Sequence, residues 1–126
     1  MHNKERARAG LPPLSPSPVL TAAAQAHAAD MARRQWMSHR GGDFSSPARR
    51  IEHAGYSFTA MGENVAAGQT TPEEAMRAWM RSPGHRHNVL GHYSEIGVGV
   101  ARASNGWLYW CVDFGKPPGK RTIESG

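Results

Sequence analysis

The sequence has a single cysteine, Cys111, among its 126 residues. One cysteine excludes an internal disulfide framework, but a domain of this length can bury enough surface to be stable without one. The chain also lacks an apolar run of transmembrane length and a signal peptide, since Met1 leads directly into the charged segment "HNKERARAG". We therefore do not expect an integral membrane protein, and any export signal would have to lie outside this sequence.

Long runs of like charge are absent as well, although the net charge is +5 and the isoelectric point is about 10.0. The basic residues, mostly arginines, are scattered along the chain and accompany no RNA-binding or zinc-finger motif. A specific nucleic-acid partner is therefore not expected. Weak affinity for anionic envelope components, such as teichoic acid or acidic lipid, fits this charge equally well.

The standard catalytic signatures are missing too: there is no HExxH, no GxSxG, no P-loop and no paired-cysteine zinc motif. Cys111 lies between Trp110 and Val112 in a strand-like segment, which favours a small buried hydrophobe over a nucleophile. Any active site would have to be built from other residues.

Four Ser-Pro or Thr-Pro pairs mark predicted helix starts, because each places a capping side chain before a proline at the first helical position. Thr71 also has Glu74 three residues further on, which predicts a capping box. In the longest of these segments, apolar and small residues recur on one helical face: Leu20, Ala24, Ala28 and Met31. The pairs are Ser17-Pro18, Ser46-Pro47 (a helix that Gly55 ends), Thr71-Pro72, and Ser82-Pro83 (a short turn that Gly91 closes).

The last third of the chain changes to the two-residue period of strands. "EIGVGVA" (95–101) alternates apolar residues with glycine, and "WLYWCVDF" (107–114) follows after Asn105-Gly106, a strong hairpin signal. "GENVAAG" (62–68) is a third candidate strand. Helices followed by a sheet of this kind predict one α+β domain.

The turn "SPGHRHNVLG" (82–91) places His85 and Asn88 three residues apart, on the same side of a helical turn, with His87 pointing elsewhere. His39, in "MSHRGGD", likewise follows a helix, where side chains can converge on a cleft. The other histidines fit packing, solvated, helix-end or loop positions: His2, His27, His53 and His92. These patterns alone do not establish a functional site, because a single histidine in a loop usually has no function.

Six blocks of sequence, in this order, resemble the CAP superfamily (the SCP domain of cysteine-rich secretory proteins, antigen 5 and plant pathogenesis-related proteins). The chain is similar to the short, cysteine-poor bacterial branch. The blocks are "HNKERARAGLPPL" (2–14), "LTAAAQAHAADMA" (20–32), "MSHR" (37–40), "GENVAAG" (62–68), "AWMRSPGHRHNVL" (78–90), and "IGVGVA" (96–101) with "YWCVDFG" (109–115).

This resemblance implies a CAP/SCP domain over residues 1–115, followed by a C-terminal tail at 116–126. It further implies an α-β-α sandwich with a central antiparallel sheet and an open cleft lined by two histidines and one or two glutamates. Carried over by motif, the histidines are His39 and His85, and the glutamate is Glu63. Asn88 and Ser82 are supporting positions: Asn88 could brace His85, and Ser82 falls where larger family members carry a second acidic residue.

Two imidazoles can bind Zn²⁺ and leave positions open for water, while Glu63 could orient an imidazole or act as general base. An alternative without any ligand is a buried polar network in which Glu63 and the histidines hold the helices on the sheet. Two functions stay open: a secreted or envelope-associated binding module for lipid, sterol, cell-wall or protein ligands, and a metal-assisted peptidase or esterase. We expect a monomer.

Overall fold

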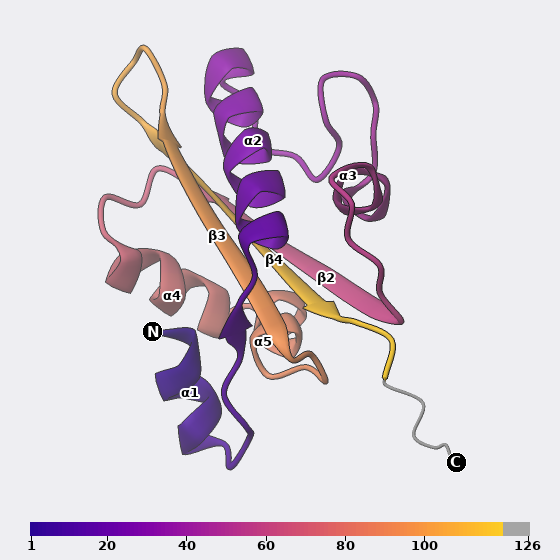
Figure 1. Cartoon of the computed structure of the whole chain (residues 1–126). Coiled ribbons are helices and arrows are strands. Elements are labelled where there is room, and N and C mark those ends of the chain that lie inside the picture. The colour runs from indigo at the N-terminus through magenta and orange to yellow at the C-terminus, as the bar shows by residue number, and fades with distance from the viewer. Residues whose placement is uncertain (120–126) are drawn as a thin grey trace.

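The computed structural model describes residues 1–119 and contains one four-stranded sheet with helices on both faces (Figure 1). The sheet order is β1-β3-β4-β2, and β4 pairs antiparallel with both β3 and β2. The expected α+β sandwich is therefore confirmed. The strands are β1 (Ser15–Pro16), β2 (Ala60–Ala67), β3 (Glu95–Arg102) and β4 (Leu108–Lys116).

The sheet is mixed rather than wholly antiparallel, because β1 pairs in parallel with β3. Its backbone N–H groups at Ser15 and Ser17 donate to the carbonyls of Ser94 and Ile96. The parallel pairing ends there because Ser17 is the N-cap of α2, which begins at Pro18. So short a strand leaves no alternating pattern by which the sequence could have predicted it.

The helices divide between the two faces of the sheet. In Figure 1, α2 crosses in front of β3 and β4, while α4 and α5 lie on the other side of the sheet. α3 lies beside α2 and close to β2. The helices are α1 (His2–Arg8), α2 (Pro18–Arg34), α3 (Pro47–His53), α4 (Pro72–Met80) and α5 (Pro83–Val89).

Three of the four predicted caps form. The hydroxyls of Ser17, Ser46 and Thr71 each accept a hydrogen bond from the backbone N–H three residues on, at 3.2, 3.2 and 3.1 Å. The capping box of α4 is shifted by one residue, because the Glu74 carboxylate accepts from Thr70 N at 2.8 Å. Ser82 precedes α5 but makes no capping bond with its side chain.

On the first face, α2 lies almost in contact with the strand backbone. A Cβ atom added to Gly97 would be 2.1 Å from the carbonyl carbon of Leu20, and one on Gly99 would be 2.5 Å from the Cα of Gln25. The apolar face predicted for this helix is confirmed, since Leu20, Ala24, Ala28 and Met31 are fully buried. The glycines of β3 therefore face α2, and the valines between them face the opposite side.

On the second face, the core is built from large side chains. Trp79 of α4 is buried, and its Nε1 donates to the carbonyl of Val65 at 3.1 Å. Apolar residues of the strands and helices complete this cluster, among them Val89, Trp110, Val112 and Phe114.

The outer edge of β2 is capped by side chains in place of a further strand. Its carbonyls at Met61, Glu63 and Val65 accept from Tyr93 Oη, Asn88 Nδ2 and Trp79 Nε1 respectively. Three edge carbonyls are thereby satisfied by the segment from α4 to the start of β3. An edge strand covered in this way offers little template for pairing with another chain.

The last strand, β4, ends at Lys116, whose carbonyl accepts a hydrogen bond from Thr59 N at 2.8 Å. Residues 120–126 of the predicted C-terminal tail lie outside the described residues. Within residues 1–119, no helix combines the length and the apolar character needed to cross a bilayer.

Candidate functional site

Glu63 is the centre of a buried polar arrangement on β2. Its side chain is 1% exposed, and Arg50 of α3 binds both carboxylate oxygens, with Nη1 to Oε2 at 2.9 Å and Nη2 to Oε1 at 3.1 Å. His39 adds a third contact, from Nδ1 to Oε1 at 3.0 Å. A two-pronged arginine pair of this kind fixes the orientation of the carboxylate.

These contacts set the charge of the pair. Burial alone would raise the pKa of Glu63, but hydrogen bonds from His39 and Arg50 outweigh burial and keep this pKa well below its ordinary value of 4.5. Burial likewise acts to lower the pKa of Arg50, and the bond to Glu63 overcomes it and raises that pKa. Glu63 is therefore a fixed anion, and a carboxylate this acidic is a weak proton acceptor.

His39 lies in the connection between α2 and α3, with 52% of its side chain exposed. A carboxylate only accepts hydrogen bonds, so Nδ1 of His39 carries the proton that binds Glu63, and Nε2 is left free in the neutral ring. Arg50 also donates to the His39 carbonyl, and His27 Nε2 donates to the Ser38 carbonyl at 2.6 Å. Both bonds position the backbone around His39.

His85 is the third residue of α5 and approaches β2 from the opposite side of the sheet. Asn64 of β2 donates to its backbone carbonyl at 3.0 Å. Burial lowers the pKa of His85 below 6.5, and the nearby His39 lowers it further. The ring of His85 is therefore neutral at neutral pH.

The two supporting residues predicted from the sequence have other partners. Asn88 Nδ2 donates to the Glu63 carbonyl at 3.1 Å and to Asn64 Oδ1 at 2.9 Å, so it braces the strand that carries Glu63 and not the His85 ring. Ser82 makes no capping bond, and its backbone carbonyl accepts from Arg86 N. His87 is exposed, as the helical spacing predicted.

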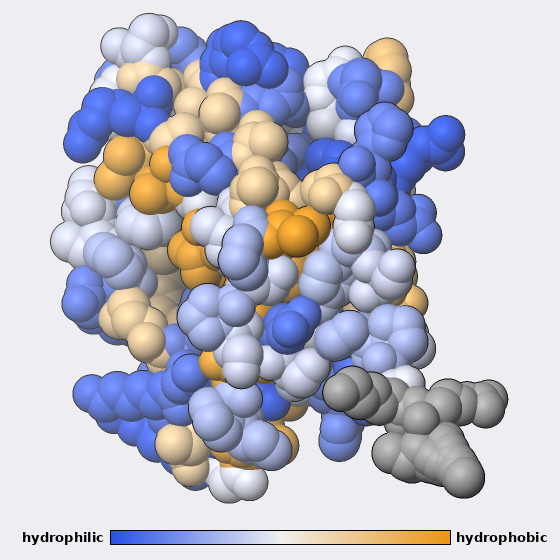
Figure 2. Space-filling view, in the orientation of Figure 1, coloured by the Kyte–Doolittle hydropathy of each residue, from blue (hydrophilic) through white to orange (hydrophobic). Residues whose placement is uncertain are grey.

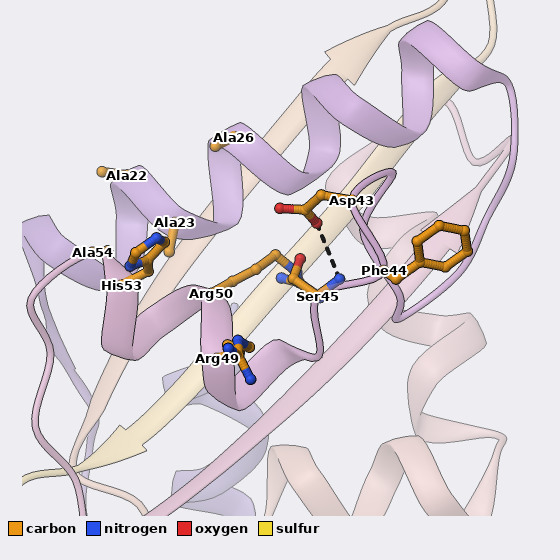
Figure 3. A pocket seen from close by; sticks show the side chains of 10 residues that line it. All are labelled: Ala22, Ala23, Ala26, Asp43, Phe44, Ser45, Arg49, Arg50, His53 and Ala54. Carbon is orange, nitrogen blue, oxygen red and sulfur yellow. Dashed lines mark hydrogen bonds between the residues drawn. The ribbon is translucent and has the colours of Figure 1, made fainter.

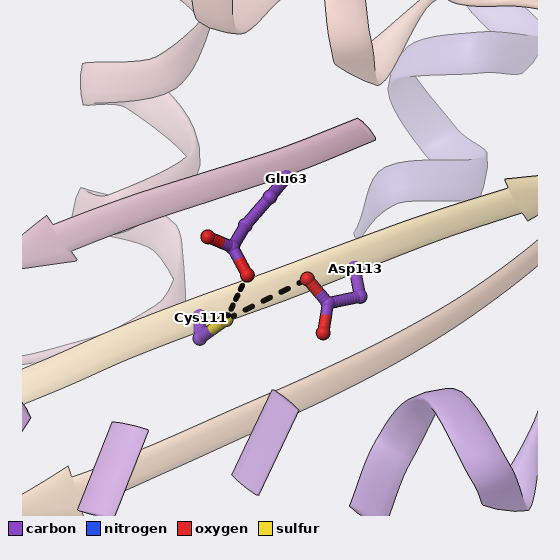
Figure 4. Close-up of side chains that lie close together, drawn as sticks. All are labelled: Glu63, Cys111 and Asp113. Atoms are coloured by element: carbon purple, nitrogen blue, oxygen red, sulfur yellow. Dashed lines mark hydrogen bonds between the residues drawn. The ribbon is translucent and has the colours of Figure 1, made fainter. Parts of the chain in front are cut away.

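Cys111 and Asp113 of β4 lie beside Glu63 (Figure 4). Cys111 Sγ is 3.3 Å from Glu63 Oε2 and 3.8 Å from Asp113 Oδ1. Burial, and then the neighbouring carboxylates, raise the pKa of Cys111; burial and Glu63 raise that of Asp113 in the same way. Cys111 is buried, as predicted, but its surroundings are polar on one side, where its thiol meets two carboxyl groups.

Within residues 1–119, Glu63, Cys111 and Asp113 form the one set of three potential ligands whose donor atoms all lie within 4.8 Å of one another. A metal ion bound there would have to displace the proton of the Cys111 thiol, because thiolate is the ligand form of cysteine. Arg50 already supplies a positive charge to Glu63. The imidazoles of His39 and His85, one with a free Nε2 and one neutral, fit a metal better.

Sequence reasoning missed Arg50 and Asp113. Asp113 did leave a signal: it is an acidic residue inside the apolar run "YWCVDF", and such residues are seldom fully buried without a partner. Arg50 left none, because it is one of two adjacent arginines in "PARRIEH" and only the packing of α3 shows which of them turns inward.

A groove of about 580 Å³ lies on the outer side of Arg50, between α2 and α3 (Figure 3). Alanines of α2 form one wall, and Arg49 and His53 of α3 form the other. Figure 3 shows Asp43 and Ser45 joined by a hydrogen bond at the end of this groove. The groove is therefore a small apolar trough with a polar, partly cationic rim.

The sequence matches the Cysteine-rich secretory protein family, CAP, over residues 1–114. The uncharacterized protein YkwD of Bacillus subtilis (strain 168) is 39% identical over 106 residues, which is 83% of this chain and 41% of YkwD. The chain therefore spans less than half the length of that relative.

Two solved structures share the fold. An outer surface protein from Borrelia burgdorferi superposes with a TM-score of 0.85 at 22% identity, covering 93% of this chain and 87% of the Borrelia chain. An extracellular protein containing an SCP domain from Bacillus anthracis str. Ames gives a TM-score of 0.82 at 27% identity, covering 91% of this chain and 37% of that one. With a family match that spans nearly the whole sequence, this chain belongs to the cysteine-rich secretory protein (CAP) family.

Proposed function

We propose that this CAP domain is an extracellular or envelope-associated binding module that holds a divalent metal ion, such as Zn²⁺, between His39 and His85. The observation that carries the proposal is the bond from His39 Nδ1 to Glu63, which orients the ring and leaves Nε2 free. Histidine ligands in metal sites usually donate their other nitrogen to a carboxylate in this way. A histidine that binds a metal must also be unprotonated, and the lowered pKa of His85 keeps its ring neutral at neutral pH.

In this proposal Glu63 orients His39 and is not the general base. Arg50 occupies both of its oxygens, and its lowered pKa makes it a poor proton acceptor at neutral pH. A Zn²⁺ ion would add Lewis acidity and would lower the pKa of a bound water. Two protein ligands are fewer than the three that are usual at catalytic zinc sites, so we expect modest affinity.

An extracellular or envelope location is supported by relatives. The Borrelia burgdorferi neighbour is named an outer surface protein, and the Bacillus anthracis neighbour is named an extracellular protein. The ligand classes that we consider are lipid, sterol, cell-wall polymer and protein.

Calorimetric titration with Zn²⁺ tests the metal site. We expect binding in the parent protein, loss of it in His39→Ala and in His85→Ala, and near-parent affinity in His87→Ala, whose side chain is exposed. Binding should weaken as the pH falls through about 6.5, because imidazoles become protonated. Equal loss in His85→Ala and His87→Ala, with none in His39→Ala, would show surface chelation by α5 alone and would reject the site.

A second candidate is a metal-assisted peptidase or esterase. The observation in its favour is the exposed His39 ring backed by a buried carboxylate, an arrangement that fixes the tautomer and the orientation of the ring. Turnover of a peptide or ester substrate that is lost in both His39→Ala and His85→Ala would support it. Turnover that survives both substitutions would belong to a contaminant or to another site.

A further inference from the structure

Residues 35–45, which follow α2 and which we call the α2–α3 loop, hold three large hydrophobic side chains in solvent. Trp36 is 65% exposed, Met37 53% and Phe44 77%. The loop is tied to the last turns of α2, because Arg34 Nη2 donates to the Arg40 carbonyl and Gly42 N donates to Asp30. The loop that carries these three side chains therefore lies beside the C-terminal end of α2 (Figure 1).

The backbone of this loop is unusual at both ends. Among residues 1–119, Gln35 and Phe44 are the two non-glycine residues with positive φ, at 53° and 67°. A bulky side chain is rare in that region of conformational space. Hydrogen bonds on each side of Phe44 maintain its conformation: Phe44 N donates to the Gly41 carbonyl, and Gly41 N donates to that of Ser45. Figure 3 shows the Phe44 ring directed away from α2. Strain that keeps an aromatic ring in water indicates a binding role for the ring.

The surroundings of the loop are basic. From residue 30 to residue 49 the chain has four arginines and two aspartates, a net charge of +2. Asp30 pairs with Arg33 and Arg34, whereas Arg40 and Arg49 have no salt bridge within residues 1–119. In Figure 2, strongly hydrophilic residues gather over the C-terminal end of α2 and over the region of α3. Exposed aromatic residues therefore occur beside uncompensated positive charge.

We propose that the α2–α3 loop docks this domain on an anionic lipid bilayer, with Trp36, Met37 and Phe44 entering the headgroup region and Arg40 and Arg49 facing lipid phosphates. Tryptophan side chains concentrate at membrane–water interfaces, and a shallow apolar anchor with basic neighbours is the usual design of a peripheral contact. An anionic surface is favoured over a neutral one by the charge of the segment. The inference does not depend on the metal site, because none of these side chains is a proposed ligand.

The four tryptophans allow a direct test. Trp79 and Trp110 are buried, whereas Trp36 and Trp107 are 65% and 54% exposed. Trp107→Phe leaves Trp36 as the exposed tryptophan, and Trp36→Phe leaves Trp107. The probe is a vesicle of phosphatidylglycerol with dibrominated acyl chains, which quenches tryptophan inserted among the lipids. With these vesicles we expect the tryptophan fluorescence of Trp107→Phe to be quenched and that of Trp36→Phe to change little. With brominated phosphatidylcholine vesicles we expect no quenching in either variant.

Vesicle sedimentation provides the matched comparison of charge and apolar contact. Arg40→Ala should weaken binding to phosphatidylglycerol roughly fivefold, while Arg81→Ala, an equal loss of charge at an exposed position after α4, should change it much less. Phe44→Ala should weaken vesicle binding roughly tenfold or more. Circular dichroism checks that these surface variants remain folded.

Three results would overturn the proposal: absence of quenching in Trp107→Phe, equal effects of Arg40→Ala and Arg81→Ala, or tight binding to a wall polymer or protein with no vesicle binding.

Discussion

The two faces of the sheet are packed in contrasting ways, although the same strands build both. Under α2 the strands present glycine, alanine and a buried polar group, and the helix lies on the backbone at Gly97 and Gly99. Under α4 and α5 they present large apolar side chains, including Trp110 and Phe114. The α2 face combines close backbone contact at these glycines with buried side chains such as Val65, Tyr109 and Cys111, whereas the other face is filled by larger apolar side chains.

This difference is connected with the site. Gly97, Asp113 and Glu63 are neighbours in one row across the sheet, since Gly97 pairs with Asp113 and Asp113 with Glu63. The glycine brings α2 close to the sheet at this row. The α2–α3 connection begins at the other end of α2, after Arg34, and its His39 Nδ1 lies 3.0 Å from Glu63 Oε1. His39 therefore comes from the connection that follows α2, and His85 comes from α5 on the opposite face.

The largest effect is expected from Gly97→Ala. The new Cβ would lie 2.1–2.5 Å from backbone atoms of Leu20 and Thr21, which cannot move aside as a side chain can. Overpacking usually costs about 1–3 kcal/mol, and here we expect roughly 4 kcal/mol or more in the free energy of unfolding by urea. The matched control is Gly84→Ala in α5, where a Cβ meets nothing within 4 Å. It should be neutral or stabilising by up to about 1 kcal/mol. Similar losses in both variants would show that α2 is not in contact with the strand.

On the opposite face, Trp79→Ala should reduce the free energy of unfolding by about 3–5 kcal/mol, because it removes a buried ring from the core. Trp79→Phe separates packing from hydrogen bonding. It keeps a ring but leaves the Val65 carbonyl without its donor, so about 1–2 kcal/mol should be lost. A Trp79→Ala protein that melts within a degree or two of the parent would mean that α4 is not docked through this residue.

Glu63→Gln should reduce the free energy of unfolding by about 2–3 kcal/mol at neutral pH, because it leaves Arg50 as a buried cation without its anion. The folded-state pKa of Glu63 lies below its unfolded value, so its stabilising contribution is present above about pH 4.5 and is lost as the pH falls further. The difference in the free energy of unfolding between Glu63→Gln and the parent should therefore become smaller below about pH 4.5. Glu52→Gln, at an exposed position of α3, is the control and should change little. If this difference in the free energy of unfolding did not change with pH, the proposed stabilising ion pair between Glu63 and Arg50 would be rejected.

Much of the fold could be predicted because its signals are local. Ser17, Ser46 and Thr71 cap the helices that follow them, and Asn105-Gly106 turns the hairpin between β3 and β4. Each signal involves residues within a few positions of one another, so one sequence is enough to interpret it.

The site was less accessible to sequence reasoning. Glu63, His39 and His85 were named from the family resemblance, and residue spacing alone would not have joined them. The ion pair from Arg50 to Glu63 joins α3 to β2, and the close approach of α2 to Gly97 joins elements far apart in the chain. Nothing in local spacing shows which of two adjacent arginines turns inward or how near a helix lies to a strand. Those facts depend on packing.

The smallest effect, and the one that tests the polar cluster most closely, is expected from Asp113→Asn. Asp113 is fully buried, its Oδ2 has no hydrogen-bond partner, and burial together with Glu63 raises its pKa well above 3.8. A group whose pKa is raised by folding stabilises the fold below its unfolded pKa and loses that contribution as the pH rises through the folded value. At neutral pH the parent therefore carries the cost of a buried acid, whereas asparagine is neutral and can still donate a hydrogen bond toward Glu63. We expect the variant to be within about 1 kcal/mol of the parent, on the stabilising side at pH 7, with the advantage shrinking toward pH 4 in urea unfolding. A loss above about 2 kcal/mol at pH 7 would show instead that Asp113 is ionised and shares the charge of Arg50, so that the α2 face contains two anions for one cation.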